Sequence, residues 1–220
     1  MIQHSDFAHL HVHTQYSLLD GACKINALLN LARNERSAAL AITDHGNLFG
    51  MIEFYQACLA NGIKPIIGCE VYIAPYSRFD KSAQGIKDTA YHLILLAKNE
   101  QGYKNLMKLV SIGFLEGFYY RPRIDREVLR KYSSGLIGLS ACLHGEIPQL
   151  ILSGENKKAE SLAGEFSEIL GQGNFYLELQ DNGLNEQKKV NRALLVLSKK
   201  LSIPVVATND VHYLNKSDSA

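Results

Sequence analysis

The sequence predicts an α/β fold, a barrel of about seven strands, from three observations. Short β-branched or apolar runs alternate with amphipathic helical patterns along the 220 residues, as in strands joined by crossover helices. The chain is 46% hydrophobic, enough for one well-buried core, so we expect one domain, residues 1–220. Histidines and carboxylates follow the ends of several strands, and these side chains converge only if the sheet closes.

Seven segments carry the strand pattern and are expected to run parallel. They are Phe7–Thr14, Ala38–Thr43, Pro65–Ile73, Tyr91–Ala97, Leu136–Ser140, Phe175–Gln180 and Pro204–Thr208. Seven strands also suit an open doubly wound sheet. An open sheet gathers its ligands mainly at one switch point, so the wide spread of polar residues favours the closed, TIM-barrel-like form.

Six amphipathic segments between the strands predict covering helices. They are Ile25–Glu35, Leu48–Ala60, Gln101–Glu116, Arg126–Lys131, Lys157–Leu170 and Glu186–Leu201. Small and polar residues between Pro75 and Thr89 predict a loop inserted near the polar end of the barrel. Only a short polar segment follows the last strand, which leaves that strand without a covering helix. We therefore expect the chain to be an N-terminal fragment of a longer protein.

Composition excludes several classes of protein. The net charge of +1 gives no global basic field for nucleic acid. The N-terminus lacks the pattern of a signal peptide, and no apolar run reaches the roughly 18 residues of a membrane span. Four scattered cysteines indicate a reducing compartment, most simply the cytoplasm. No P-loop, GxSxG or Rossmann fingerprint is present.

Three histidines in the first predicted strand point to metal. Strand alternation places His9, His11 and His13 on one face, with Leu10 and Val12 on the other. Two neighbouring neutral imidazoles on one strand face can chelate one ion, so His11 and His13 are predicted ligands. For His9 a ligand and a core residue remain equal alternatives.

The next two strands end in further candidates. His45 follows the second strand in AITDHGN and is a predicted ligand, while Asp44 could bind metal or cap the following helix. Glu70 lies inside the apolar run PIIGCEVYI, where a carboxylate is costly unless it is paired or metal-bound. Cys69 points to the opposite face and is expected in the core.

Later strands repeat this arrangement. Cys142 and His144 follow GLIGLSA, and Cys142 is either a zinc-binding thiolate or an ordinary buried cysteine. Asp210 and His212 close the last strand, next to the first strand in a closed barrel. About nine candidates exceed the three or four ligands of one zinc ion, which predicts two or three ions bridged by Glu70. Clustered divalent ions suit phosphoester hydrolysis.

Two arginines follow in YYRPRID. Arg121 and Arg123 could hold a substrate phosphate, or they could belong to a solvated loop.

Eight ordered blocks, spanning nearly the whole chain, resemble the polymerase and histidinol phosphatase (PHP) domain. The blocks are HLHVHTQYSLLDG, LAITDHGNLFG, IKPIIGCEVYIA, HLILLAKNEQGYKNLMKL, FYYRPRID, GLIGLSACLHGE, FYLELQDNG and PVVATNDVHYL. More narrowly they resemble the branch of this family at the N-terminus of the alpha subunit of bacterial DNA polymerase III.

The resemblance implies a distorted seven-stranded barrel holding three divalent ions of zinc, manganese or iron. It implies one ion on His11, His13, Glu70 and Asp210, a second on Glu70, His92 and Cys142, and a third on Asp20, His45 and His212. Asp20 and His92 enter only through the resemblance, because an Asp-Gly turn and a lone histidine are ambiguous. His11, His13, Glu70 and Asp210 are the implied catalytic residues. Free phosphatases of the family usually carry histidine at the positions of Asp20 and Cys142, which favours the polymerase branch.

Three functions compatible with this resemblance follow. The first is a 3′–5′ exonuclease acting on a primer 3′ end, within a DNA-directed DNA polymerase (a nucleotidyltransferase) of the replication machinery. The second is a metal-stabilised scaffold that supports the polymerase core and docks the proofreading exonuclease or other replisome subunits. The third is a stand-alone histidinol-phosphatase-like phosphoesterase. Expected partners are DNA and the remaining polymerase domains, and no membrane.

Overall fold

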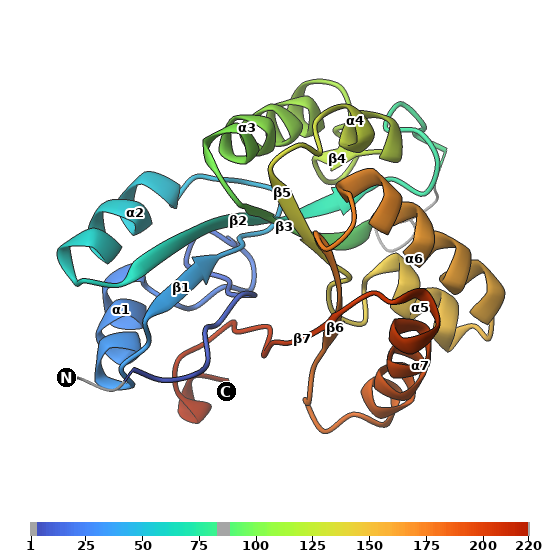
Figure 1. Ribbon diagram of the computed structural model, residues 1–220. Helices are drawn as coiled ribbons and strands as arrows, with labels where there is room; N and C mark the ends of the chain where they lie inside the picture. Colours follow the sequence, from blue (N-terminus) through green and yellow to red (C-terminus); the bar gives the residue numbers. More distant parts are fainter. Residues whose placement is uncertain (1–3, 83–88, 220) are drawn as a thin grey trace.

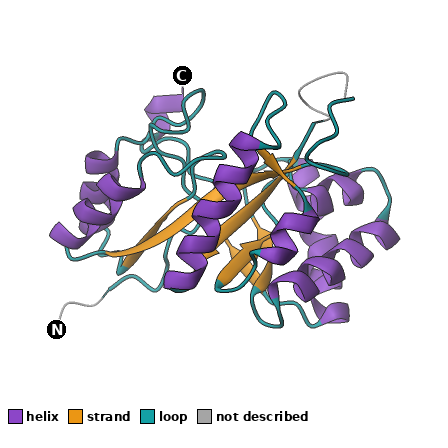
Figure 2. Cartoon of the chain, turned by 90° about the horizontal axis from the view of Figure 1, so that it is seen from above, coloured by secondary structure: helices purple, strands orange, loops and turns teal. Residues whose placement is uncertain are grey.

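The computed structural model describes residues 4–82 and 89–219 as an α/β fold. The sheet is strongly curled, and helices cover its outer side (Figure 1). Seen from above, the strands run through the middle of the molecule with the helices around them (Figure 2). The predicted fold class, an α/β barrel-like sheet, is confirmed.

Seven strands form one sheet within the described residues. They are β1 (Ala39–Ile42), β2 (Lys64–Ile73), β3 (Tyr91–Ala97), β4 (Arg123–Ile124), β5 (Leu136–Leu139), β6 (Phe175–Leu179) and β7 (Val205–Ala207). Their order is β1-β2-β3-β5-β6-β7, and the short β4 pairs with β2 beside this path. Six agree with predicted strands to within one or two residues. Strand β4 has two residues, too few to show an alternating pattern.

The predicted strand Phe7–Thr14 is wrong as a regular strand. This segment makes isolated bridges, from His9 to Leu40 and from Val12 to Val211. The Val12 carbonyl accepts from the Thr43 N–H at 2.9 Å. The segment thus connects the end of β1 to the chain after β7 and closes the curled sheet.

Side chains of this segment do not alternate as predicted. Leu10 packs with Ala41 and Ile94 inside the curled sheet, whereas Val12 packs with Ile25 and Leu28 in a separate cluster outside it. His11 points inward directly after Leu10, because its ring is paired with buried carboxylates. His9 instead contacts the edge of Phe7, with ring centroids 5.0 Å apart, and belongs to none of the ligand groups found among the described residues.

The expectation of parallel strands is wrong for β3. It runs antiparallel to β2 and to β5, while the other named pairs are parallel. The connection from β2 to β3 holds no helix in its described parts, 74–82 and 89–90, and without a crossover the chain returns antiparallel. Part of the predicted loop, 83–88, lies outside the described residues. Because β3 is reversed, its first residues lie at the end of the barrel where the parallel strands finish.

Seven α-helices and one short 3-10 helix lie within the described residues. They are α1 (Ile25–Asn34), α2 (Met51–Ala60), α3 (Glu100–Leu115), α4 (Arg126–Lys131), α5 (Glu146–Leu152), α6 (Asn156–Leu170), α7 (Asn185–Leu201) and η2 (Lys216–Ser219). The sequence patterns predicted all the α-helices except α5, whose seven residues include Pro148 in the first turn. Among the described helices, none has the length and apolarity to cross a bilayer.

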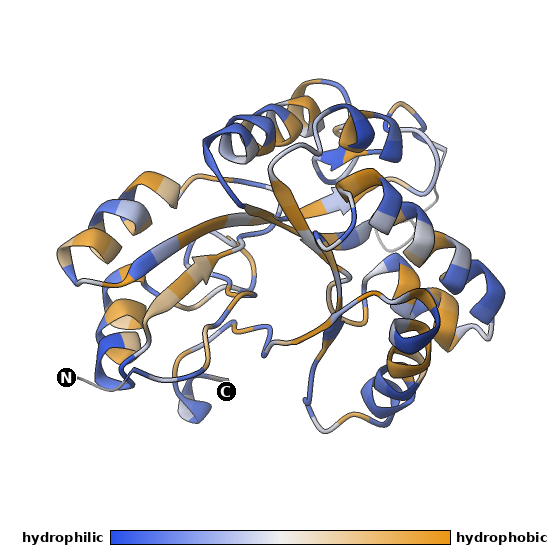
Figure 3. Cartoon of the chain, viewed as in Figure 1, coloured by the Kyte–Doolittle hydropathy of each residue, from blue (hydrophilic) through white to orange (hydrophobic). Residues whose placement is uncertain are grey.

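Two apolar layers hold the sheet. The inner faces of the strands form one cluster, including Ala41, Ile94 and Leu139. The outer faces pack against the helices in a larger cluster, including Leu95, Leu106 and Phe166. Figure 3 shows the apolar residues along the strands, with both apolar and polar residues on helices α3 and α6. Cys69 lies in the outer cluster, as expected.

Candidate metal centre

All nine predicted ligands lie at one end of the barrel. Seven of them line a cavity of about 890 Å³: Asp20, His45, Glu70, His92, Cys142, Asp210 and His212. His11 and His13 lie beneath it, both with 0% exposure. They come from the closing segment, from loops after β1, β5 and β7, from within β2 and from the start of β3.

The first ligand group is His11, His13, Glu70 and Asp210. His11 Nε2 lies 3.0 Å from His13 Nε2, 2.9 Å from Glu70 Oε2 and 3.0 Å from Asp210 Oδ1. His13 Nε2 lies 3.3 Å from Asp210 Oδ1 and 3.8 Å from Glu70 Oε2. Ligands about 2.0–2.2 Å from a tetrahedral ion are about 3.3–3.6 Å from one another. The spacing of these four atoms therefore fits one ion.

The second carboxylate oxygen of Glu70 faces other histidines. Its Oε1 lies 2.6 Å from His45 Nδ1 and 2.7 Å from His92 Nδ1. Despite these distances, Glu70 Oε1 and His45 Nδ1 are not aligned for a hydrogen bond and have no such partner among the described residues. Buried polar atoms without partners are costly. Their convergence on a common point is the geometry expected of ligands, and it makes Glu70 suited to bridge two ions.

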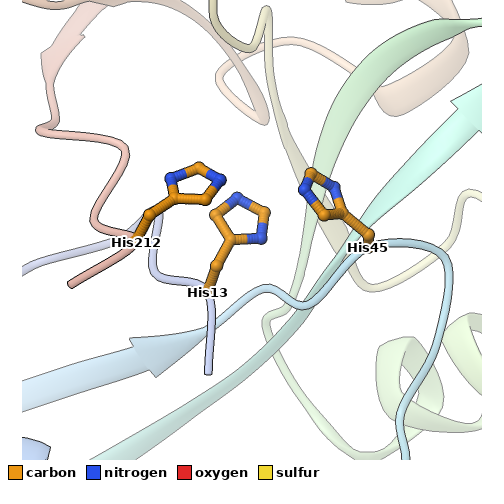
Figure 4. Close-up of side chains that lie close together, drawn as sticks. All are labelled: His13, His45 and His212. Carbon is orange, nitrogen blue, oxygen red and sulfur yellow. The ribbon is translucent and has the colours of Figure 1, made fainter. Parts of the chain in front are cut away.

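A third group lies on the outer side of the first. His13, His45 and His212 converge from three separate segments (Figure 4). The His13 ring is 4.1 Å from that of His45 and 4.2 Å from that of His212, centroid to centroid. Asp20 Oδ2 lies 3.3 Å from His45 Nε2 and 4.0 Å from His212 Nε2. Asp20 is thus brought to the cavity edge.

The charges of the centre are strongly coupled. Burial would raise the pKa of Glu70, but His92, His11 and His45 hold it well below its usual range. Burial also opposes ionisation of Asp210, yet His11 and His13 lower its pKa to about 2. Burial would lower the pKa of His11, but Glu178 and Asp210 raise it well above its ordinary value. Glu70 and Asp210 are therefore ionised, and a bound divalent ion would neutralise their charge.

Cys142 completes this picture of a cation-binding site. Burial, followed by the charges of Glu70 and Asp210, raises the pKa of its thiol well above the usual value. A thiol in such surroundings becomes a thiolate when a metal ion binds it. The donor set of imidazoles, carboxylates and one thiol fits a divalent ion such as zinc.

Backbone strain also gathers at the centre. Among the described residues, five non-glycine residues have positive φ, and two of them, Arg36 and Ser202, lie just beyond the C-terminal ends of helices. The other three are Asp210 (φ 49°), Ala141 (φ 64°) and Tyr120 (φ 59°). Asp210 is a candidate ligand, and Ala141 and Tyr120 precede Cys142 and Arg121. Such conformations cost about 1–3 kcal/mol each and concentrate at functional sites.

Asp44 neither joins a ligand group nor caps a helix. Its Oδ1 accepts from the Thr14 N–H at 2.6 Å and from Ser17 Oγ at 2.8 Å, and its Oδ2 accepts from Thr14 Oγ1. The residue before α2 is Gly50. Asp44 therefore fixes the first part of the loop that runs from His13 to Asp20.

Glu178 is a residue of the candidate centre that the sequence did not predict. It is buried on β6, and its Oε1 lies 2.7 Å from His11 Nδ1. Gln180 Nε2 donates to the same oxygen at 2.9 Å, as does Thr208 Oγ1. A carboxylate behind a ligating histidine fixes the ring and its tautomer. The signal was present, because FYLEL places a carboxylate in an apolar strand as PIIGCEVYI does for Glu70.

The two arginines have different surroundings. Arg121 lines the cavity, its guanidinium lies 4.7 Å from the ring centroid of Tyr72, and it donates to the Tyr72 hydroxyl. Arg123 is buried and donates to the carbonyls of Gly117 and Asp80, among others. Arg123 is not among the residues lining the cavity, so its guanidinium serves the backbone around it.

Comparisons with known proteins identify a matching family model and relatives of similar sequence. A family model described as "PHP domain" matches residues 9–182. DNA polymerase III subunit alpha of Treponema pallidum is 52% identical over 213 residues, covering 97% of this chain and 18% of that protein. The protein of the same name from Thermus aquaticus is 52% identical over 216 residues, again covering 97% and 18%. The chain thus spans about a fifth of the length of these curated relatives.

A solved structure shares the fold. It is a two-domain protein from Bacteroides vulgatus that contains a predicted PHP-like metal-dependent phosphoesterase. The TM-score is 0.54 at 11% identity, over 93% of this chain and 51% of that one. At that identity the match supports the fold alone.

Proposed function

The chain belongs to the PHP domain family, and from this premise we propose that it is the PHP domain of a bacterial DNA polymerase III alpha subunit and hydrolyses phosphodiesters at a primer 3′ end. The identity of about half to two alpha subunits over nearly the whole chain supports the first part. The second part rests on the ligand geometry of the metal centre. For the longer protein the proposal includes polymerase activity, contact with DNA and with the other replisome subunits, and a cytoplasmic location.

The arrangement around Glu70 carries the proposal. This buried carboxylate touches His11 with one oxygen and His45 and His92 with the other. A single carboxylate that faces two groups of ligands is the expected centre of a multinuclear site. A structural zinc ion needs only one closed set of four ligands. A larger set of ligands at the floor of a cavity therefore favours a catalytic site over a structural one.

The proposed ligand sets are those that the resemblance implies, and they share most of their members with the groups that the geometry brings together. One ion is assigned to His11, His13, Glu70 and Asp210, a second to Glu70, His92 and Cys142, and a third to Asp20, His45 and His212. Zinc, manganese and iron are the candidate ions. When bound, divalent ions supply charge for phosphate oxygens and lower the pKa of water.

The chain's own residues would hold these ions and orient the groups around them. His11 and His13 form the buried floor, and Glu178 holds the His11 ring by its Nδ1 atom. Arg121 faces the cavity, where its guanidinium is available to a phosphate and Tyr72 limits its freedom. The cavity of about 890 Å³ has room for a terminal nucleotide.

The test compares the wild-type chain with Asp210→Asn on single-stranded DNA carrying a 3′ label, with zinc or manganese. The substitution keeps the size of the side chain and removes the charge beside His11 and His13. Hydrolysis is expected to fall by at least about 10²-fold, with the fold retained by circular dichroism. Asp6→Asn, at an exposed carboxylate outside the centre, serves as the control.

Two outcomes contradict the proposal. If wild type binds metal but does not hydrolyse DNA, the domain is a metal-stabilised scaffold. If Asp210→Asn cleaves as fast as wild type, the activity comes from elsewhere.

A further inference from the structure

His144 lies in the metal centre although none of the three proposed ligand sets includes it. Its Nδ1 is 3.8 Å from Cys142 Sγ, and His92 Nδ1 is 3.9 Å from the same sulfur. The ligand atoms of these three residues all lie within 4.8 Å of one another. The imidazole rings of His92 and His144 are 5.3 Å apart between centroids.

The backbone holds His144 in this position. Its carbonyl accepts a hydrogen bond from the His92 N–H at 3.1 Å, and Gly145 forms a bridge with His92. The Gly145 N–H donates to the Cys142 carbonyl at 2.9 Å, which closes a tight turn. A Cβ at Gly145 would lie 2.2 Å from the Ser140 carbonyl oxygen, so the turn requires glycine. The loop after β5 is thereby fixed against the start of β3.

Packing does not explain the ring of His144. It lines the cavity and is largely exposed, so it is not a core residue. Within the described residues, its side-chain hydrogen-bonding contact is with Cys142 Sγ, a weak partner. An imidazole fixed beside a thiol and a second imidazole has the chemistry of a ligand.

We propose that His144 is a further ligand of the ion held by His92 and Cys142, which closes that site with Glu70 as the fourth donor. This inference rests on the proposed metal centre. A carboxylate oxygen, a thiolate and two imidazoles make four protein ligands, the number of a closed tetrahedral zinc site. The donor set selects zinc or a similarly soft ion over magnesium or calcium. Water activation then belongs to the other ligand groups, and this ion fixes Glu70 and the loop after β5.

Cobalt(II) titration tests the proposal without measuring activity. With wild type we expect thiolate-to-cobalt charge transfer and the intense d–d absorption of a four-coordinate ion. His144→Ala should keep the charge-transfer band, lose d–d intensity as more than one water enters the open side and raises the coordination number, and bind this ion at least about tenfold more weakly. His144→Cys, which restores a soft donor, should recover the intensity. His4→Ala removes an exposed histidine outside the centre and is the control.

The readouts separate two failures. If Cys142→Ser abolishes the charge-transfer band while His144→Ala leaves spectrum and affinity unchanged, His144 is not a ligand and this inference is overturned, with the metal centre intact. If wild type itself binds no cobalt or zinc, the metal centre fails and the inference fails with it. Circular dichroism of each variant confirms that the chain is folded.

Discussion

Two cavities of nearly equal volume lie at opposite ends of the barrel. The cavity of about 890 Å³ contains Glu70, His92 and Asp210 and is lined largely by titratable side chains. The other, of about 870 Å³, is bordered by the first residues of β1 and β2 and lined mainly by apolar side chains, among them Ile66 and Leu96. The volume of a cavity therefore does not indicate its chemistry here. The position of its lining residues along the strands does.

The difference follows from how the strands end. At the metal end, loops leave the parallel strands and can carry ligands without disturbing the ladder. At the apolar end, inward side chains continue the inner core, where a polar group would lose its hydration. The metal end is held by charge pairing, which offsets the cost of its strained backbone, and the apolar end by burial. Each end should respond to a different perturbation.

The largest expected effect is at the apolar end. Leu96 is 4% exposed on β3 and belongs to the inner cluster. Leu96→Ala should lower the free energy of unfolding by about 2–5 kcal/mol, because it removes buried methyl groups and leaves a void. Urea unfolding measures this change, and the metal content of the folded protein should be unchanged.

Ile52→Ala is the matched control for that variant. Ile52 lines the same cavity but is 58% exposed, so its truncation should change the free energy of unfolding by no more than about 0.5 kcal/mol. Loss of metal from Leu96→Ala in its folded state would show that the two ends are coupled and do not respond separately.

Metal removal is the converse perturbation. The buried carboxylates Glu70 and Asp210 lose their cation on chelation, so the melting temperature should fall. An ion at about 100 times its Kd stabilises a protein by about 2.7 kcal/mol, which for a chain of this size corresponds to about 5–11 °C. Differential scanning calorimetry with and without a chelator, followed by added zinc, measures the shift.

The same chelation experiment on two variants sharpens the comparison. Leu96→Ala should show the full shift from a lower starting temperature, and Asp210→Asn should show a smaller one. A melting curve that does not change after verified loss of metal would show that metal binding at the ligand cluster does not stabilise the fold.

Much of the fold could be predicted from the sequence, because burial dictates local patterns. Six strands and six helices were found from alternation and amphipathicity alone. The direction of β3 could not be predicted, because the segment between β2 and β3 has no periodic pattern that would reveal whether a crossover helix joins the two strands. The segment 7–14 misled for a physical reason: ion pairs of His11 override the alternation that apolar packing would impose.

The sequence points most directly to site residues whose burial is costly by itself. Glu70 stands out as a carboxylate in an apolar strand, and Glu178 carries the same signal in FYLEL. His92 gives no such signal, because its place in the centre follows from the reversal of β3. Arg121 and Arg123 are indistinguishable as sequence, and only the structure shows that one faces the cavity and the other the backbone.

Glu178 offers a subtler test of the metal end. Glu178→Gln keeps the length of the side chain but removes the charge 2.7 Å from His11 Nδ1. Outer carboxylates of this kind typically contribute about 10–100-fold in metal affinity, so zinc binding measured by competition with a chromogenic chelator should weaken within that range. Glu168→Gln, on the exposed side of α6, is the control. Equal affinities for the two variants would mean that His11 keeps its orientation without Glu178.

The smallest expected effect concerns Arg121, which lies in the cavity but in no ligand group. If its guanidinium holds a substrate phosphate, Arg121→Ala should raise KM about fivefold, near 1 kcal/mol for a solvent-accessible charge pair. The value of kcat should hardly change, because such binding is equal in the ground state and the transition state.

Lys108→Ala removes an exposed positive charge from the surface of α3 and controls for general electrostatic attraction of DNA. A fall in kcat with KM unchanged would instead assign Arg121 to the reacting phosphate, and equal KM values in the two variants would remove it from substrate binding. Arg123 is unsuitable for this comparison, since its loss would leave several buried carbonyls without donors and destabilise the chain before any kinetic effect is seen.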